Sequence, residues 1–412
     1  MNHVNGYPAR PALGRRDIIY FSCVAWDPIK QRPHQITLQM ARTNRVLYVE
    51  PMLSIATRAF QGFESPLPRL RRVSSGLFVY TPPSFLPFSL KSSLANRINK
   101  RLLRESVKRV VKRLGFSRPI LGVSHPQDEA LLGHFRECVS FYDCMDDYSA
   151  LPDPRANPEL VARMERQLLH KADQIFVSSR PLFESLNGFQ EKCALVRNGV
   201  VASQFGDQES GSFPSALNGI PEPLIGYIGV LGAWMDGEAL AFLARSRPDW
   251  SLVLIGPILD RALAKRLRSF RNVYLLGTKC HEDLPALVRR FAVALIPFAL
   301  TRLTRAVDPI KLYEYLAAGK PVVTSDLPEV RRFGDLVSIY YSREQLVRLV
   351  EAHLQETGTV EQMRRRRAAM DNTWEDRVAC MARALSQRFR EANAQPGFYA
   401  TDGPAHNTSP YL

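Results

Sequence analysis

Short runs of β-branched and aromatic residues alternate with helical segments along almost the whole chain, and this alternation constrains the fold more than any other feature. Such alternation predicts βα units, in which parallel strands form a sheet that helices cover on both faces. Residues 202–223 interrupt the pattern, because they are rich in Gly, Ser, Pro and Asn, a composition typical of linkers. We expect strands before this interruption at 17–22, 45–50, 77–81, 120–124, 139–143, 174–178 and 194–197, and after it at 224–228, 251–255, 272–276, 293–297 and 321–325.

The length of the chain, 412 residues, suffices for two domains that each bury a core. The sequence therefore predicts an α/β protein of two Rossmann-like, doubly wound domains that face a cleft. Several strands end in Gly or Pro, for example at Gly229, and open α/β sheets bind ligands at those ends. The expected parts are a disordered N-terminus at 1–16, an N-terminal domain at 17–205, a linker at 206–222, a C-terminal domain at 223–372, a helix at 373–392 that packs back towards the N-terminal domain, and a disordered tail at 393–412.

The charge of the chain is strongly positive, with 55 Lys and Arg against 40 Asp and Glu, a formal net charge of +15. Such a protein attracts polyanions, which include nucleic acid, anionic lipid and phosphorylated substrates. Six cysteines without a C-x-x-C pair argue against a disulfide framework and a structural zinc site. We find neither the apolar core of a signal peptide at 1–16 nor a run of about 18 apolar residues, so we expect a cytoplasmic protein.

The segment 304–323, TRAVDPIKLYEYLAAGKPVV, carries an unusually complete set of helix signals. Asp308 is a favoured N-cap, Pro309 suits the first helical position, and Gly319 stands where a helix ends. Apolar residues at i, i+3 and i+4 spacing would pack on the sheet. These residues are Leu312, Tyr315 and Leu316.

The opening of this helix has the residue types of a diphosphate site. A helix N-terminus carries partial positive charge and unpaired N–H groups, to which Arg305 and Lys311 would add formal charge. Glu314, one turn further, is placed to accept hydrogen bonds from vicinal hydroxyls such as O2 and O3 of a ribose. The alternative is that Lys311 and Glu314 form a solvated pair worth a few tenths of a kcal/mol, and the pattern alone does not decide between the two.

The run DPIKLYEYLAAGKPVV resembles the donor-site signature of GT-B glycosyltransferases, in particular glycosyltransferase family four. The similarity is greatest to bacterial members that build exopolysaccharide or cell-wall glycans. Eight further pieces match in order along the chain: QRPHQ (31–35), RVLYVEP (45–51), FYDCMDDYS (141–149), ADQIFVSS (172–179), RNGV (197–200), IGYIGVLGAWMD (225–236), PDWSLVLIGP (248–257) and NVYLLG (272–277).

The resemblance implies a hexosyltransferase on the GT-B fold, which moves a sugar from a nucleotide-diphosphate sugar to a glycan or lipid-linked acceptor in bacterial surface polysaccharide synthesis. It implies that Gly229, Arg305, Lys311 and Glu314 bind the donor.

The sequence departs from the usual pattern of the family at two positions in the donor site. The first of the two glutamates that are usual in family four is replaced by Ala306, and the loop 229–234 has no Arg or Lys. The diphosphate charge must then be met elsewhere, by Lys311, Arg305 and Arg302.

The catalytic candidates follow strands of the N-terminal domain. His125 stands where similar transferases often place a histidine against the donor sugar, and Asp146 is a candidate general base. The carboxylates of Asp143, Asp146 and Asp147 do not form the D-x-D that single-domain GT-A enzymes use for a metal. We therefore expect no essential metal and no cofactor besides the donor substrate. The resemblance implies a retaining reaction, whereas the sequence leaves inversion open.

The acceptor candidates are Trp26, Arg32 and His34, which follow the first strand at a helix start. Aromatic and Arg side chains in such a loop can stack on and hydrogen-bond a sugar or a lipid phosphate. The alternative is a Trp that anchors the loop.

The region 91–118 holds ten Lys or Arg residues and a single acidic residue, Glu105, with apolar residues at helical spacing. A basic amphipathic helix indicates contact with an anionic membrane, and the alternative is a helix packed on its sheet with a solvated basic rim. Similar transferases with lipid-linked acceptors use this region at the membrane, which implies a peripheral position at the inner face of the plasma membrane.

Two other functions fit parts of the sequence. A nucleotide-sugar 2-epimerase on the same fold would also hold a ribose with a glutamate, but it needs no acceptor site. A basic nucleic-acid-binding protein is the other alternative. The chain lacks a helix-turn-helix, zinc-finger or RNP pattern, so we expect no specific nucleic acid as partner.

Overall fold

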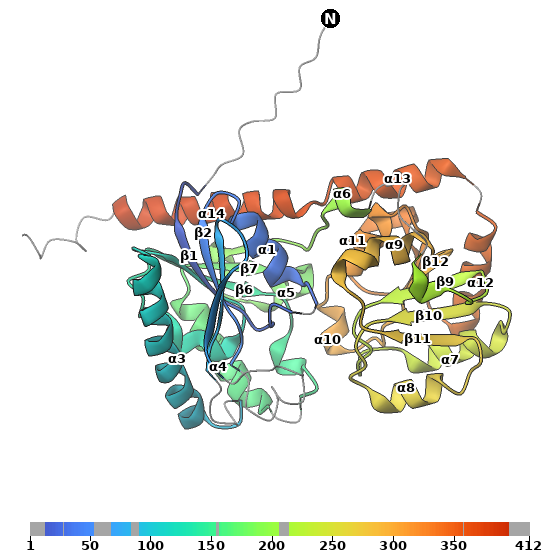
Figure 1. The fold of residues 1–412 in the computed structure, drawn as a ribbon, viewed down its shortest axis with the longest axis horizontal. Coiled ribbons are helices and arrows are strands. Elements are labelled where there is room, and N and C mark those ends of the chain that lie inside the picture. The colour runs from blue at the N-terminus through green and yellow to red at the C-terminus, as the bar shows by residue number, and fades with distance from the viewer. Residues whose placement is uncertain are drawn as a thin grey trace, which may run out of the picture.

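The computed structural model describes residues 13–27, 29–52, 67–83, 90–153, 156–205, 214–356 and 358–394. They form two α/β domains that lie side by side, each with its own sheet (Figure 1). The expected disordered tail 393–412 and the predicted N-terminus 1–16 lie largely outside the described residues, as does much of the linker 206–222.

The N-terminal sheet has the strand order β3-β4-β2-β1-β5-β6-β7-β8 among the described residues. All its neighbouring strands pair in parallel except β3, which is antiparallel to β4. The strands are β1 (Asp17–Phe21), β2 (Arg45–Val49), β3 (Arg69–Arg72), β4 (Leu77–Thr81), β5 (Ile120–Val123), β6 (Val139–Cys144), β7 (Gln174–Val177) and β8 (Cys193–Leu195). The helices are α1 (Arg32–Met40), α3 (Ser93–Leu114), α4 (Pro158–Lys171) and α5 (Arg180–Ser185).

The C-terminal sheet is parallel throughout, with the order β11-β10-β9-β12-β13-β14. Its strands are β9 (Leu224–Ile228), β10 (Ser251–Ile255), β11 (Val273–Gly277), β12 (Val293–Ile296), β13 (Val322–Ser325) and β14 (Ser338–Tyr340). Its helices are α7 (Gly237–Ser246), α8 (Arg261–Leu267), α9 (Leu284–Arg289), α10 (Arg302–Arg305), α11 (Ile310–Ala317), α12 (Arg343–Leu354) and α13 (Thr359–Met370), and the short α6 (Ala202–Phe205) precedes the domain.

The strands at the centre of both sheets are buried along their whole length, as in β9 and β10. This is why they appear in the sequence as continuous apolar runs, since helices cover both faces of a parallel sheet. The predicted fold class, two Rossmann-like domains, is confirmed. The sequence did not indicate two of the four edge strands in the described sheets, β3 and β14, because they are short and partly exposed.

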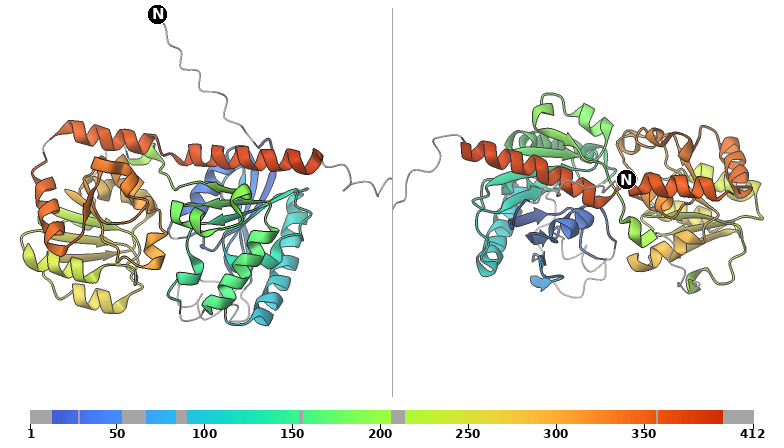
Figure 2. Two further views of the ribbon diagram at one scale, coloured as in Figure 1. Left: turned by 180° about the vertical axis from the view of Figure 1, so that it is seen from behind. Right: turned by 90° about the horizontal axis from the view of Figure 1, so that it is seen from above.

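The last helix, α14 (Trp374–Ala394), leaves the C-terminal domain and runs along the N-terminal one (Figure 2). Trp374, Met381 and Leu385 are buried in the same apolar cluster as Tyr20 and Tyr48 of the N-terminal sheet. The chain therefore crosses between the domains twice, once after β8 and once before α14.

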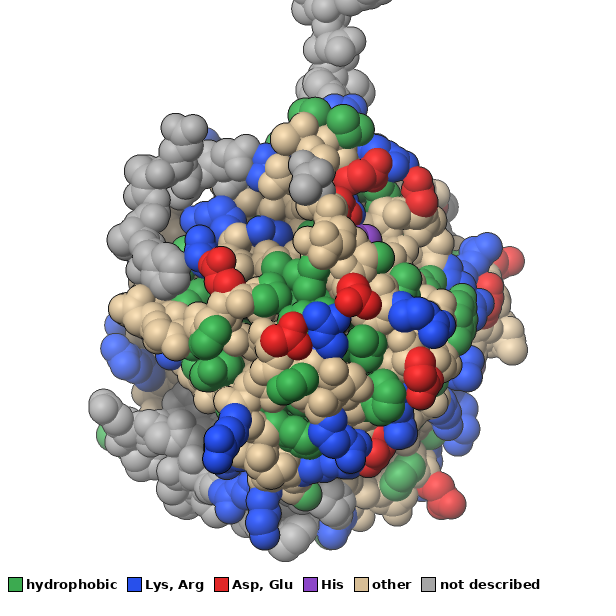
Figure 3. Space-filling view, turned by 90° about the vertical axis from the view of Figure 1, so that its right-hand side faces the viewer, with side chains coloured by type: hydrophobic (Ala, Val, Ile, Leu, Met, Phe, Trp, Pro, Cys, Tyr) green, Lys and Arg blue, Asp and Glu red, His purple; other side chains and the backbone are tan. Residues whose placement is uncertain are grey.

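On the outer face of the C-terminal domain, basic and acidic side chains are interspersed (Figure 3).

Among the described residues, no helix is both long enough and apolar enough to cross a membrane.

Candidate functional site

A cavity of about 310 Å³ lies between the two domains. Its C-terminal wall comes from the end of β9, the end of β12 and the first turns of α11. The carboxyl ends of parallel strands are where open α/β sheets bind ligands. The side chains that line this wall include Tyr227, Trp234, Phe298, Lys311 and Glu314, and those of the N-terminal wall include Ile29, Lys30, Arg32, Met145 and Asp146.

The helix α11 aims Lys311 and Glu314 at the cavity because its other face is held on the sheet. Leu312, Tyr315 and Leu316 are fully buried in the core of the C-terminal domain. The Tyr315 hydroxyl accepts a hydrogen bond from the backbone N–H of Ile228 at 2.8 Å. This bond fixes α11 against the end of β9, so the three-residue spacing brings both charged side chains to the cavity.

The Lys311 ammonium has an aromatic surrounding. Its nitrogen lies 5.2 Å from the ring centre of Tyr227 and 4.8 Å from that of Phe298. Burial lowers the pKa of Lys311 to about 8, and the Glu314 carboxylate opposes this shift. Burial likewise raises the pKa of Glu314 to about 7, with Lys311 opposing. Neither side chain forms a hydrogen bond or an ion pair with another described residue. Both are therefore available to a ligand.

Gly229 follows β9 and lines the cavity next to Lys311. Its φ is +139°, and a Cβ at this position would lie 3.0 Å from both the Lys311 Cε and the Tyr227 hydroxyl. A side chain would fill the space beside the ammonium. The glycine thus lets a ligand approach the backbone next to Lys311.

The other cations predicted for the donor lie elsewhere. Arg305 is exposed and does not line the cavity, because it ends α10, a short helix that turns it to solvent. Arg302 forms an ion pair with Asp147 of the N-terminal domain at 2.7 Å. The start of α11 also differs from the prediction, because Pro309 occupies the N-cap position and Asp308 is buried before it.

Two predicted acceptor residues, Trp26 and His34, are buried outside the lining of the cavity. The two rings pack against each other and against Tyr48, with centres 5.0–5.4 Å apart. His34 Nδ1 accepts from the backbone of Gln31 at 2.9 Å, and burial lowers the pKa of His34 to about 4. The prediction that Trp26 and His34 face an acceptor in this cavity is wrong. Their aromatic cluster with Tyr48 anchors the loop instead.

Arg32 does line the cavity, but all three nitrogens of its guanidinium already donate hydrogen bonds within the protein. It donates to Asp143 at 2.7 and 2.9 Å, to the Val196 carbonyl at 2.8 Å and to Asn198 at 3.1 Å. The ion pair with Asp143 is buried on both sides. Arg32 therefore holds the N-terminal domain together at the cavity wall.

Of the catalytic candidates, Asp146 lines the cavity and His125 does not. The His125 ring packs on Tyr148 with centres 4.6 Å apart and caps a short helical turn, Pro126–Leu131. Burial lowers the pKa of His125 to about 3, which keeps the ring neutral. Burial, together with the charge of the neighbouring Asp147, raises the pKa of Asp146 to about 7. Such a carboxyl can exchange a proton near neutral pH.

Asp146→Asn is expected to stabilise the protein more at pH 8 than at pH 5. The pKa of Asp146 is raised in the folded state, so folding favours the protonated carboxyl, and this contribution to stability is lost as the pH rises through about 7. A neutral amide avoids that loss. Melting temperatures at the two pH values measure the effect, and an equal difference at both would contradict the buried setting of Asp146.

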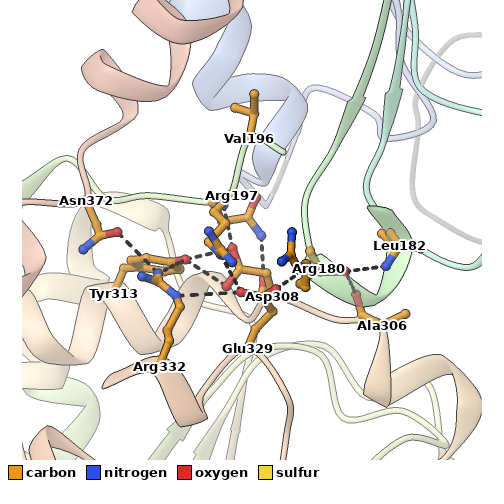
Figure 4. Close-up of polar contacts among 12 residues, drawn as sticks. Arg180, Leu182, Val196, Arg197, Ala306, Asp308, Tyr313, Glu329, Arg332 and Asn372 are labelled. Atoms are coloured by element: carbon orange, nitrogen blue, oxygen red, sulfur yellow. Dashed lines mark hydrogen bonds and ion pairs between the residues drawn. The ribbon is translucent and has the colours of Figure 1, made fainter. Parts of the chain in front are cut away.

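The structure also brings together residues that the sequence did not single out. Figure 4 shows Arg180 and Arg197 of the N-terminal domain facing Asp308 and Glu329 of the C-terminal one. The motif RNGV, 197–200, marked this place in the sequence without indicating a role. Throughout the described ranges, we find no group of three or more His, Cys, Asp or Glu side chains arranged to hold a metal ion.

Comparison with known proteins shows that part of the chain is similar to glycosyltransferases. Residues 222–354 match the family model of the glycosyl transferases group 1. The putative teichuronic acid biosynthesis glycosyltransferase TuaH of Bacillus subtilis (strain 168) is 28% identical over 204 residues, which cover 46% of this chain and 51% of TuaH. The matched part thus spans about half the length of that curated relative.

Solved structures share the overall fold. The α,α-trehalose-phosphate synthase of Burkholderia xenovorans, in complex with glucose-6-phosphate, superposes with a TM-score of 0.65 at 12% identity, covering 92% of this chain and 100% of that one. The HepE protein of Anabaena, in complex with UDP and glucose, has a TM-score of 0.62 at 14% identity, covering 90% and 100%. The chain thus has the two-domain GT-B fold of these structures, and its residues 222–354 are similar to the glycosyl transferases group 1.

Proposed function

We propose that this chain is a glycosyltransferase that moves a hexose from a nucleoside-diphosphate sugar to a glycan or lipid-linked acceptor. The observation that carries the proposal is the pair Lys311 and Glu314, which face the cavity between the domains from the first turns of α11. An ammonium at a helix start suits a diphosphate, and a carboxylate one turn away suits the ribose hydroxyls.

The arrangement also suggests how the chemistry proceeds. When the bond between the sugar and the diphosphate breaks, negative charge grows on the leaving diphosphate. Lys311 and the helix start can stabilise that charge without reorganising, which is the usual source of a large rate gain. We therefore propose a metal-independent reaction with retention of configuration, and Asp146 as the side chain that exchanges a proton with the acceptor.

The comparisons support the assignment to surface polysaccharide synthesis. The relative TuaH is named for teichuronic acid biosynthesis, and the HepE structure contains UDP and glucose. We propose a related role for this chain, with a UDP-sugar as the first donor to try.

The proposal is tested by thermal shift with UDP-, GDP- and ADP-sugars, followed by an assay of nucleoside diphosphate release. A ligand that binds only the native state raises the melting temperature. The proposed transferase should release the diphosphate faster when the acceptor is added, and, because the proposed reaction is metal-independent, it should do so in EDTA as well. Release that is unaffected by any glycan or lipid-linked acceptor, with a new sugar nucleotide as product, would favour a 2-epimerase.

We further propose that α3 places the protein on an anionic membrane surface. Leu94, Ile98 and Leu102, four residues apart on one face, have exposed fractions of 65%, 41% and 48%. In the same first turns of α3, the face that packs on the domain is polar. Asn96 and Lys100 are buried there, and Lys100 forms an ion pair with Asp128. A helix with its apolar stripe outward and basic neighbours beside it fits a lipid interface.

Replacing Leu94, Ile98 and Leu102 together by Gln is expected to reduce binding to phosphatidylglycerol vesicles by about tenfold or more, since each apolar side chain contributes on the order of 1 kcal/mol. Co-sedimentation measures the binding. The matched control replaces the exposed apolar residues of α13, which are Val360, Met363 and Met370 at 58–61% exposure. Equal binding by the two triple variants would contradict the membrane proposal.

A further inference from the structure

The segment that leads into α11 is held to the N-terminal domain at three successive points. Arg302 pairs with Asp147 at 2.7 Å, and the Ala306 carbonyl accepts from the Ser179 hydroxyl at 2.5 Å. The third point is Asp308, next to Pro309 at the helix start. These contacts join the donor side of the cavity to the opposite wall.

The contact at Asp308 is the most complete of the three. The backbone N–H of Asn198 donates to the Asp308 carboxylate at 2.6 Å, and the Asn198 amide group donates to the Asp308 carbonyl at 2.5 Å. The same carboxylate accepts from the Tyr313 hydroxyl at 2.8 Å. Asp308 is thereby fixed both to the N-terminal domain and to α11.

The other end of the Asn198 side chain reaches into the N-terminal domain. Its amide oxygen accepts from Arg32 at 3.1 Å, and Arg32 in turn is bound to Asp143. Asn198 is buried, and both polar atoms of its side chain are used. A continuous series of hydrogen bonds thus runs from the N-terminal core to the residue three positions before Lys311.

A second group of contacts surrounds this series. Glu329 is buried and accepts from the Arg197 side chain at 2.6 Å and from the backbone N–H of Arg180. Arg332 donates to the Tyr313 hydroxyl at 2.7 Å (Figure 4). The carboxylates of the C-terminal domain therefore meet cations and N–H donors of the N-terminal domain next to the start of α11.

We propose that Asn198 is a positioning residue, which sets the start of α11, and with it Lys311, against the N-terminal wall of the cavity. The inference rests on the proposed function, because it names what holds the nucleotide-binding helix in place. Asn198 acts through Asp308 and the backbone, so it affects donor affinity more than the chemical step.

Asn198→Ala is expected to raise the KM for the sugar nucleotide and the Kd for UDP about tenfold, and to keep kcat within about twofold of wild type. The reason is that the lost hydrogen bonds position α11, which binds the nucleotide, and do not contact the reacting atoms. Calorimetry and initial rates measure these constants. The matched control is Asn272→Ala. Asn272 donates to the carbonyls of Ala244, Arg247 and Trp250 at 3.0–3.1 Å, away from the cavity. It should lower the melting temperature and leave the UDP affinity unchanged.

Asp308 provides a second pair of variants. Asp308→Asn keeps an acceptor for the Asn198 N–H and is expected to bind UDP within about twofold of wild type, whereas Asp308→Ala is expected to weaken binding about tenfold. If Asn198→Ala does not fold, this pair decides the inference.

Equal UDP affinity in wild type, Asn198→Ala and Asp308→Ala would overturn the inference while leaving the proposed function intact. Failure of the wild-type protein to bind any nucleoside diphosphate would instead overturn the proposed function. An equal loss of affinity in Asn272→Ala would show that general destabilisation, and not positioning, is responsible.

Discussion

Lys311→Met is expected to lower kcat/KM for the sugar nucleotide by about 100- to 1000-fold, as the loss of one well-placed donor to a developing charge usually does. In the described part of the C-terminal wall, Lys311 is the one Lys or Arg that lines the cavity, and Lys30 and Arg32 belong to the opposite wall. Met keeps the length and apolar contacts of the side chain with Tyr227 and Phe298. The fold should therefore be kept.

The pH dependence of UDP binding is a second property that this variant should change. The pKa of Lys311 is lowered to about 8 by burial, so wild-type affinity for UDP should fall as the pH rises through this value, and the variant should show no such fall. Lys320→Met is the matched control, because the pKa of Lys320 is also lowered to about 8 by burial and this side chain lies outside the cavity. Activity of Lys311→Met close to that of Lys320→Met would contradict the role of Lys311.

Arg32→Met is expected to destabilise the protein by about 3–5 kcal/mol, because it leaves the Asp143 carboxylate buried without its cation. Both side chains of this pair are at most 1% exposed. Adding Asp143→Asn removes the stranded charge and keeps an acceptor for the Tyr20 hydroxyl, so the double variant should recover part of the loss.

Urea denaturation followed by circular dichroism measures these stabilities. Arg331→Met is the comparison. Arg331 also donates two hydrogen bonds to a carboxylate, that of Asp326, at 2.5–2.6 Å, but its side chain is 58% exposed. A clearly smaller loss is expected there, because water solvates the exposed pair. Equal losses in Arg32→Met and Arg331→Met would contradict the structural role that we assign to Arg32.

The features that local sequence determines were predicted well. The helix of Lys311 and Glu314 has its apolar face, its charged face and its terminating Gly319 within ten residues, and the buried strands have continuous apolar runs. Both follow from periodicity alone, without knowledge of what packs nearby. The start of α11 was placed too early, because the buried contacts of Asp308 keep this residue out of the helix.

The features that depend on tertiary contacts were not predictable in the same way. Trp26 and His34 have the residue types of an acceptor loop, yet the aromatic cluster with Tyr48 turns them inward. The role of Asn198 requires two segments 110 positions apart to meet across a domain boundary. No local pattern indicates such a meeting, since asparagine after a strand is also a favoured turn residue.

The central claim is that Glu314 binds the ribose of a nucleoside diphosphate at the start of α11, and a calorimetric double-mutant cycle tests it most directly. Wild type and Glu314→Gln are each titrated with UDP and with 2′,3′-dideoxy-UDP. We predict that wild type prefers UDP by about tenfold or more, as for hydrogen bonds to a charged group, and that this preference largely disappears in Glu314→Gln. The same preference for UDP in both proteins would contradict the claim.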